Sequence, residues 1–233
     1  MAQMLADADH ALVLAAAKRL IAGSNTDREK LERIFLFVRD DIVFGFPVEG
    51  DLVPASKTLR TKLGQCNTKA TLFLALCRAS GVPARIHFSL IGKEIQRGFF
   101  TGIAYWLMPK SISHSWIEVE IEREWRRIDS FINDLPLHNA AERELARRGW
   151  TVGYSLALAD GRANADLSVD EEAFEQMAAV TDDHGTWDDP ADYYASAMYK
   201  NRPGPLKLLA YRLLIGRVNR RVEQVRAGFT AEK

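Results

Sequence analysis

The sequence has few of the features that mark disulfide-rich, membrane-spanning or nucleic-acid-binding proteins. It has 2 cysteines among 233 residues, no apolar run long enough to span a bilayer, and 31 acidic against 31 basic side chains. The N-terminal stretch has acidic residues where a secretory signal would have basic ones, which favours an amphipathic helix. With free thiols and no leader, we expect a cytoplasmic protein that does not bind nucleic acid.

The two cysteines are too far apart to pair with each other. Cys66 and Cys77 fall in one predicted helix, where eleven residues at about 1.5 Å each separate them by about 16 Å. A disulfide requires Cα atoms within about 7 Å. Both thiols are therefore predicted to be free.

The net charge of zero hides two segments of opposite sign. Residues 160–192 contain eleven Asp or Glu and one Arg, and residues 206–228 contain six Lys or Arg and one Glu. A charge-rich stretch is usually a solvated face, so we assign function to neither segment. No acidic cluster has the alternating spacing of a calcium loop, and we expect neither a metal nor another cofactor.

Apolar periodicity predicts helices in both halves of the chain. The strongest signal is CNTKATLFLALCRAS (residues 66–80), which is apolar almost all round and is therefore predicted to be a buried helix. We expect Gly81 to end it in the left-handed conformation and Pro83 to prevent it from resuming. The other predicted helices are residues 1–23, a helix capped by Thr26 or Asp27, a short helix within 50–63, a mostly helical region after Leu135 and an amphipathic helix from about Leu206.

Three segments alternate between apolar and polar residues, as strands do. They are ARIHFSLIG (84–92), SHSWIEVEIE (113–122) and EWRRIDSF (124–131). Residues 93–112 carry aromatic side chains without a clear period, which indicates a long loop or flap. Strands that follow helices without βαβ alternation indicate an α+β fold with an antiparallel sheet.

Cys66 has the sequence position of an activated nucleophile. A helix N-terminus and a neighbouring imidazolium both favour a thiolate, and such sites lower a cysteine pKa to about 3.5–7.5. Gly64 leaves room for a substrate to approach the sulfur. A backbone N–H at the helix start is the first candidate donor to an oxyanion, and Gln65 is the second. Cys77 lies in mid-helix among leucines and is predicted to be an inert core residue.

A cysteine nucleophile requires a base, and the base requires an acceptor that orients it. His114 begins the second predicted strand, and Asp129 lies on the third. A hairpin turn at 120–123 would place these two residues opposite each other. A turn at 122–124 would instead place Asp129 opposite Ile117 and would require a bulge.

Three stretches of the sequence resemble the motifs of transglutaminase-like domains, in the order that this family uses. GQCNTKATLFLALCRASGVPAR resembles the cysteine motif, which has a glycine, one residue, the cysteine, an apolar helix and a G-[IV]-P-A-R ending. SHSWIEVEIEREWRRIDSF resembles the second and third motifs. There an aromatic residue and then E-V follow the catalytic histidine, and the catalytic aspartate ends a W-x-x-[IVF]-D strand. The resemblance covers about residues 27–135.

The resemblance implies a cysteine enzyme that transfers an acyl group through a thioester on Cys66. It implies His114 as general base and then acid, and Asp129 as the group that orients the imidazole. The implied fold is an α+β papain-like or transglutaminase-like core, with the cysteine helix packed on the antiparallel sheet and helical additions at both ends. We accordingly expect a catalytic core in residues 1–140 and a mainly helical extension in residues 141–233.

The implied substrate is a small molecule, peptide or protein with an amide or ester bond. Water would resolve the thioester in an amidase or peptidase, and an amine would resolve it in an acyltransferase; the motifs do not distinguish the two. The flap side chains Phe99, Tyr105 and Trp106 are candidates for the acyl site, although packing against the sheet explains them equally well. Trp116 is expected to shield the imidazole from water.

Two other functions fit parts of the sequence. An arylamine N-acetyltransferase-like enzyme also orders Cys, His and Asp, but LGQC lacks the R-G-G-x-C motif of that family. A non-catalytic binding or scaffold module would dock its basic C-terminal helix on a partner or an anionic membrane surface. The apolar stripe of that helix would be Leu208, Leu209, Leu213 and Val218. We favour a terminal helix that packs on its own domain.

Overall fold

Helix α4 (Cys66–Ala79) is the centre of the computed structural model, which describes residues 4–167, 172 and 174–228. Twelve of its 14 residues are buried, which confirms the prediction from its apolar surface. Gln65 caps its first turn through a reciprocal pair of bonds with Thr68. Gly81 follows its last turn with φ of 72°, in the left-handed conformation that the sequence predicted.

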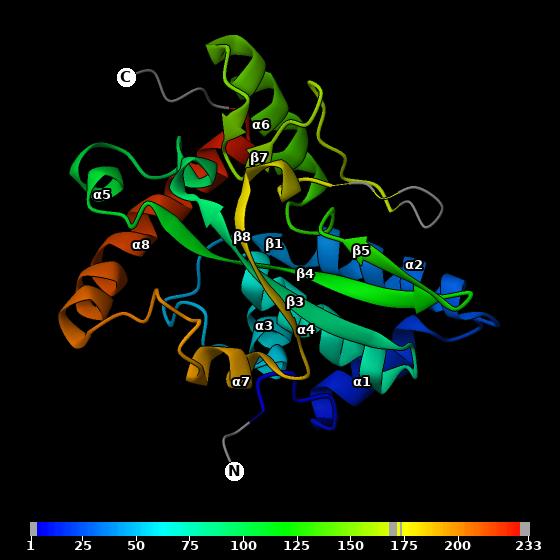
Figure 1. Cartoon of the computed structure of the whole chain (residues 1–233). Helices are drawn as coiled ribbons and strands as arrows, with labels where there is room; N and C mark the ends of the chain where they lie inside the picture. Colours follow the sequence, from blue (N-terminus) through cyan, green and yellow to red (C-terminus); the bar gives the residue numbers. More distant parts are fainter. Residues whose placement is uncertain (1–3, 168–171, 173, 229–233) are drawn as a thin grey trace.

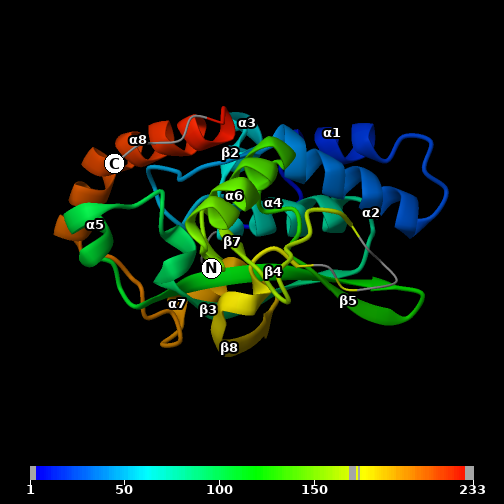
Figure 2. The ribbon, with the colours of Figure 1, turned by 90° about the horizontal axis from the view of Figure 1, so that it is seen from above.

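Three helices surround α4 on the side away from the sheet (Figures 1 and 2). They are α1 (Ala11–Leu20), α2 (Asp27–Leu36) and α3 (Ala55–Thr61), and a short π-helical turn, Phe37–Asp41, extends α2. Thr26 caps α2, as predicted. The helix predicted over residues 1–23 is shorter in the structure, because α1 begins only after its cap His10 and ends at Leu20; residues 1–3 lie outside the described residues. The preceding backbone is held differently: the N–H groups of Leu5 and Ala6 bond to the carboxylate of Asp189.

One four-stranded antiparallel sheet packs against α4, in the order β5-β4-β3-β8 (Figure 1). The predicted strands are β3 (Ala84–Gly92), β4 (Ser111–Ile121) and β5 (Glu124–Ile128). Alternation sends Ile86 and Ile117 toward α4, where both are buried. The fold is therefore α+β, with the cysteine helix on an antiparallel sheet, as the sequence predicted.

The fourth strand, β8 (Val180–Trp187), lies in the acidic segment that we expected to be merely solvated. That expectation is wrong for these residues, because β8 pairs with β3 and forms an edge of the sheet. Its sequence is polar because an edge strand faces water, and a register shift between His87 and Ser89 interrupts any regular alternation. The His87 ring also bonds to Asp183 across this pair, at 2.6 Å.

The β4–β5 hairpin has a shorter turn than either arrangement that we considered. Ile121 pairs with Glu124, so the turn consists of the two residues Glu122 and Arg123. Both have positive φ, 54° and 68°, as a tight type I′ turn requires. Continuing the register by one residue past the last pair sets Asp129 level with Trp116, two residues from His114. Both predicted registers are therefore wrong.

The remaining elements cover the ends of the sheet. The flap contains a 3₁₀ turn, η2 (Lys93–Gln96), and a short helix, α5 (Gly102–Trp106), where we predicted a loop. The others are β1 (Val43–Phe44), β2 (Leu63–Gly64), α6 (Leu135–Arg148), β6 (Val152–Gly153), β7 (Leu156–Ala157), η3 (Met177–Ala179), α7 (Pro190–Ala195) and α8 (Pro205–Arg226). Among the described residues, no helix has the length and apolar character that crossing a membrane requires. The division at residue 140 stays a prediction.

Asp134 joins three of these elements at one buried carboxylate. It caps α6 by accepting from the N–H of Leu137, and it accepts from the N–H of Phe44 in β1. Arg226 at the end of α8 donates two bonds to it, at 2.8 and 2.7 Å. Burial opposes ionisation, but these bonds and the charge of Arg226 together lower the pKa of Asp134.

We expect Asp134→Ala to lower the free energy of unfolding by about 3–5 kcal/mol, because it removes the buried partner of Arg226 and leaves that charge only the more exposed Glu223. Urea denaturation followed by circular dichroism measures the change. The matched control is Asp27→Ala, which breaks a more exposed pair with Lys30 and should cost about 1 kcal/mol or less. Equal losses in the two variants would contradict the anchoring role, as would an Arg226→Met background in which Asp134→Ala costs as much as in the native chain.

Candidate active site

Cys66 is the first residue of α4, and its side chain is almost fully buried. The thiol donates to Oε1 of Gln65 at 2.9 Å. The backbone N–H groups of Asn67 and Ser115 lie near enough to the sulfur to favour its thiolate. Ser115 is the residue after His114, so the sulfur lies beside strand β4 at the level of the predicted base.

The environment of Cys66 keeps the thiol protonated. Burial raises the pKa of the Cys66 thiol, and the nearby carboxylates of Asp51 and Asp129 raise it further. The amides of Asn67 and Ser115 act in the opposite direction but do not compensate for these effects. The expectation of an ionised sulfur is therefore wrong for this structure, because desolvation outweighs the helix N-terminus.

Asp51 is a neighbour of the thiol that the sequence analysis missed. Gln65 Nε2 donates to Oδ1 of Asp51 at 2.6 Å, and the Tyr199 hydroxyl donates to Oδ2 at 3.0 Å. Burial raises the pKa of Asp51. Gln65, predicted as a second oxyanion donor, therefore caps α4, accepts a hydrogen bond from the thiol and donates one to Asp51. Nothing in the local sequence marks Asp51, because its partners come from α4 and from a loop near the C-terminus.

His114 is a fully buried residue of β4. Neither ring nitrogen has a hydrogen-bond partner among the residues that the structure describes. Burial lowers the pKa of His114 to about 3, so the imidazole is neutral at physiological pH. The Trp116 ring lies 6.0 Å from the imidazole, centroid to centroid, and is itself stacked on His87 at 4.1 Å. One nitrogen of a neutral imidazole has a lone pair and can take a proton, although burial makes His114 a weaker base than a solvated histidine.

Asp129 follows the last residue of β5 and is fully buried. Its Oδ1 accepts from the N–H of Glu175 at 2.7 Å, and its Oδ2 accepts from the N–H groups of Gln176 and Met177. Burial nevertheless raises the pKa of Asp129 to about 7. No hydrogen bond joins Asp129 to His114 in the described part of the chain. Oδ1 keeps a second acceptor position, since a carboxylate oxygen has two.

The segment that holds Asp129 is itself fixed by a buried ion pair. Glu175 Oε1 lies 2.6 Å from Nδ1 of His138 in α6, and Glu175 Oε2 accepts from the N–H of Asn133 at 2.9 Å. Its charged partner and the two amide donors of Asn133 keep Glu175 satisfied in the interior. The position of the Asp129 carboxylate is thus set by residues far beyond it in the chain.

The side chain of His114 leaves β4 on the face opposite the one that α4, with Cys66 at its start, packs against. Asn67 Nδ2 reaches the carbonyl of Ser113 at 3.3 Å and its hydroxyl at 3.4 Å, so Ser113 faces α4. Alternation sends His114 to the opposite face, together with Trp116. Strand β5 ends its pairing at Ile117, so β4 has no β5 partner beside His114. The structure thus brings the thiol to the backbone edge next to His114, without a hydrogen bond between the two side chains.

The flap side chains do not share one environment. Phe99 is buried, with its ring 5.9 Å from that of Phe44 and 5.6 Å from that of Tyr154. Tyr105 lies under the ammonium of Lys93, and Trp106 is largely exposed. Phe99 therefore packs in the core. No described ring contact or hydrogen bond joins these three residues to Cys66, and their role at the acyl site stays a prediction.

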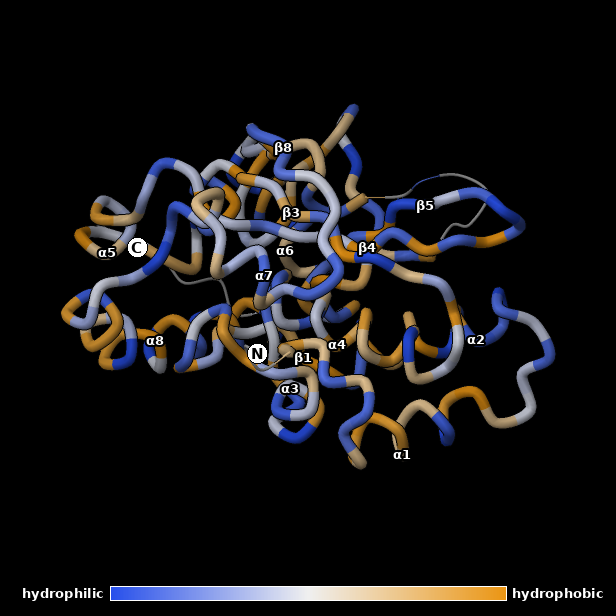
Figure 3. Tube along the Cα trace, turned by 60° about the horizontal axis from the view of Figure 1, so that its bottom comes forward, coloured by the Kyte–Doolittle hydropathy of each residue, from blue (hydrophilic) through white to orange (hydrophobic). Residues whose placement is uncertain are grey.

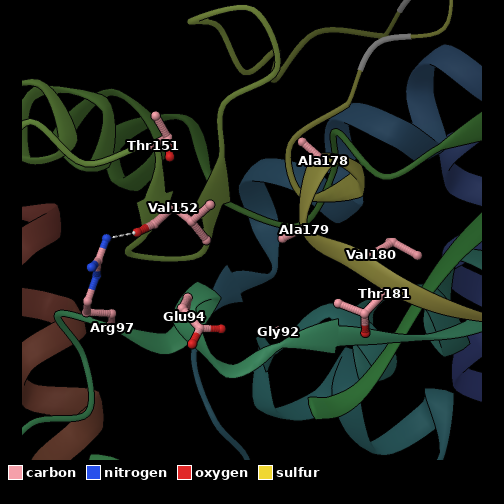
Figure 4. Close-up of a pocket in the computed structure, with 9 residues that line it drawn as sticks. All are labelled: Gly92, Glu94, Arg97, Thr151, Val152, Ala178, Ala179, Val180 and Thr181. Atoms are coloured by element: carbon pink, nitrogen blue, oxygen red, sulfur yellow. Dashed lines mark hydrogen bonds between the residues drawn. The ribbon is translucent and has the colours of Figure 1, made fainter. Parts of the chain in front are cut away.

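A cavity of about 370 Å³ lies at the C-terminal end of β3, beside Gly92 (Figure 4). Arg97 donates to the carbonyl of Val152 at its rim, at 2.7 Å. The lining residues are Gly92, Glu94, Arg97, Thr151, Val152, Ala178, Ala179, Val180 and Thr181. They include none of Cys66, His114 and Asp129. In the described part of the chain, no group of three His, Cys, Asp or Glu side chains is arranged to hold a metal ion.

The sequence model of the transglutaminase-like superfamily matches residues 14–130, which is half of the chain. Cys66, His114 and Asp129 all fall within the match. No curated protein matches the chain in sequence.

Two solved structures are similar to part of the chain. A candidate cysteine protease from Cytophaga hutchinsonii has 19% sequence identity and a TM-score of 0.42, over 55% of this chain and 39% of its own. A candidate protease from Parabacteroides distasonis has 16% identity and a TM-score of 0.37, over 53% of this chain and 25% of its own. The chain thus spans well under half of the length of either protein.

We expect Asp51→Asn to lower the pKa of the Cys66 thiol, because Asp51 is the carboxylate that raises this pKa most. Alkylation by iodoacetamide, followed by intact mass across a pH series, measures the change in a Cys77→Ser background that leaves one thiol. The pH profile should move to lower pH and the rate at pH 8 should rise several-fold. Asp9→Asn, an exposed carboxylate elsewhere, is the matched control. Superimposable profiles for the Asp51 variant and the control would contradict the electrostatic coupling.

Proposed function

Since the chain belongs to the transglutaminase-like superfamily, we propose that it is a cysteine enzyme that transfers acyl groups through a thioester on Cys66. The observation that carries this proposal is the place of the thiol: it lies at the head of a buried helix, beside the backbone of the residue that follows His114. A structural cysteine needs neither backbone amides that favour its thiolate nor a neighbouring strand that carries a buried histidine without a described hydrogen-bond partner. Cys77 is fully buried in mid-helix, and no backbone amide of the described residues is among the groups that shift the pKa of its thiol.

The first half-reaction starts from a neutral pair, thiol and imidazole. As the sulfur forms a bond to the carbonyl carbon of the substrate, His114 takes the thiol proton and the carbonyl π electrons move to oxygen. The oxygen then restores its double bond, the carbon–nitrogen or carbon–oxygen bond breaks, and His114 gives the proton to the leaving amine or alcohol. Cys66 is left as a thioester, and a backbone N–H at the start of α4 is the candidate donor to the oxyanion.

The second half-reaction resolves the thioester. Water or an amine attacks the carbonyl carbon while His114 takes a proton from it, and the sulfur leaves and recovers that proton. Hydrolysis results if water reaches the carbon, and acyl transfer results if the pocket admits an amine and excludes water. We propose an amide- or ester-containing small molecule, peptide or protein as substrate, and the cytoplasm, where thiols stay reduced, as the site of action.

The triad needs one local adjustment in order to close. The imidazole must reach the thiol around the edge of β4 that β5 leaves unpaired. Its other nitrogen can then donate to the free acceptor position on Oδ1 of Asp129, which the three backbone amides hold in place. A carboxylate held by three backbone donors has a fixed position from which it can orient the imidazole.

We expect an activated ester to leave its acyl group on Cys66. After incubation with a pool of p-nitrophenyl esters, intact mass should show one added acyl group, and peptide mapping should place it on Cys66. Cys77→Ser, the matched control, should acylate like the native chain, and Cys66→Ala should not react. A His114→Ala variant should acylate more slowly by on the order of 10²–10⁴, the contribution of a general base. Acylation that persists in Cys66→Ala would contradict the proposal.

We also expect the rate of acylation to rise with pH around a midpoint near 7. Burial raises the pKa of Asp129 to about 7, so the carboxylate is protonated below that pH and orients the imidazole only above it. His114, with a pKa of about 3, stays neutral between pH 5 and pH 8, so its titration does not change the acylation rate in this range. Stopped-flow measurement of p-nitrophenol release gives the profile. Asp129→Asn should abolish the rise; a native-like rise in that variant would rule out Asp129 as its source.

A further inference from the structure

Two helices expose large apolar side chains that the core does not use. The exposed fractions are 77% for Ile103, 76% for Trp106, 68% for Leu107, 82% for Leu206 and 73% for Leu213. The first three belong to or follow α5, and the last two belong to the first half of α8. We call these five residues the apolar tip. Large apolar residues exposed together usually mark an interaction surface.

The two parts of the apolar tip lie at the same end of the molecule. Figures 1 and 2 show α5 beside the first half of α8, and Figure 3 shows apolar residues on both. Arg221 of α8 donates to the carbonyl of Phe99 and to the hydroxyl of Thr101, just before α5. Asn201, ahead of α8, donates to the carbonyl of Ser111 after α5. These bonds fix the two segments relative to each other.

Helix α8 packs on the domain mainly from Ile215 onward, and in its first half Tyr211 packs on the core and donates to the carbonyl of Pro47. The buried residues are Ile215, Val218, Val222 and Val225. The apolar stripe that we predicted for α8 is therefore largely wrong: Val218 is buried, Leu208 is half-buried, and Leu209 and Leu213 are exposed. Packing on the domain explains the apolar residues of α8 from Ile215 onward. It does not explain the exposed Leu206, Leu209 and Leu213.

The charge around the apolar tip is strongly basic. Residues 93–112 and 200–221 together contain ten Lys or Arg and one Glu, whereas the rest of the chain contains 21 Lys or Arg and 30 Asp or Glu. Lys110, Lys207 and Arg217 are among the exposed basic residues. The two segments that carry the apolar tip thus have nine more basic than acidic residues, within a chain whose net charge is zero.

We propose that the apolar tip docks on the surface of an anionic lipid bilayer. Leucine, isoleucine and tryptophan side chains enter the boundary between headgroups and acyl chains, and the surrounding Lys and Arg contact lipid phosphates. Tryptophan favours this interfacial depth. A second copy of the chain is a poor occupant, because it would set two equally basic surfaces against each other. Docking here is independent of the chemistry at Cys66.

Sedimentation of the full chain with sucrose-loaded vesicles tests the proposal. The chain should bind vesicles of phosphatidylcholine with phosphatidylserine and should bind pure phosphatidylcholine at least tenfold more weakly, and added salt should weaken the binding. The double variant Trp106→Ser/Leu213→Ser should lose at least tenfold in partition coefficient, and Lys110→Glu/Lys207→Glu should lose binding at low salt. Leu12→Ser/Leu52→Ser, which changes exposed residues elsewhere, is the matched control and should bind like the native chain.

Circular dichroism melts establish that each variant folds, and the substituted side chains are exposed, so little change is expected. Light scattering across a concentration series measures self-association. Three results would overturn the proposal: equal binding to neutral and anionic vesicles, binding that survives both double variants, or a dimer that the tip substitutions dissociate. The last result would assign the face to a second copy of the chain.

Discussion

Helix α4 has almost no face turned to water, and the rest of the structure is arranged around that constraint. A helix buried on all sides needs other helices around it and a sheet beneath it, and its polar side chains need partners inside the protein. Lys69 donates to the carbonyl of Arg39, and burial lowers the pKa of this lysine to about 7. Burial also raises the pKa of Cys66, so the helix that carries the thiol keeps it protonated.

The features that sequence analysis predicted correctly depend on neighbours in the chain. The all-round apolar surface of residues 66–80, the alternation in three strands and the cap at Thr26 can each be seen within a dozen residues. The α+β class follows from their order. The family resemblance depends on motifs of the same length, and for that reason it located the cysteine, histidine and aspartate segments within the region that the superfamily model matches.

The features that it missed depend on distant parts of the chain. Strand β8 is recognised only by its partner β3, about a hundred residues earlier, and its own composition suggests solvated coil. The hairpin register is set by Glu122 and Arg123, which both have positive φ. Neither residue type prefers that conformation, so the sequence does not predict this turn. The protonated thiol has the same origin, because Asp51 and the segment after Phe174 approach the site from opposite directions in the sequence.

The pairing of β3 with β8 has a consequence for how the chain folds. Contacts between residues far apart in the sequence form late in folding. Closing the long loop between them costs conformational entropy before the contact stabilises the chain. Helix α4 and the β4–β5 hairpin can form from local contacts, but Asp189 secures Leu5 and Ala6 only after almost the whole chain has been synthesised. A nascent chain would therefore hold its thiol in a looser, wetter setting than the finished protein does, and would be open to oxidants until the last strand is in place.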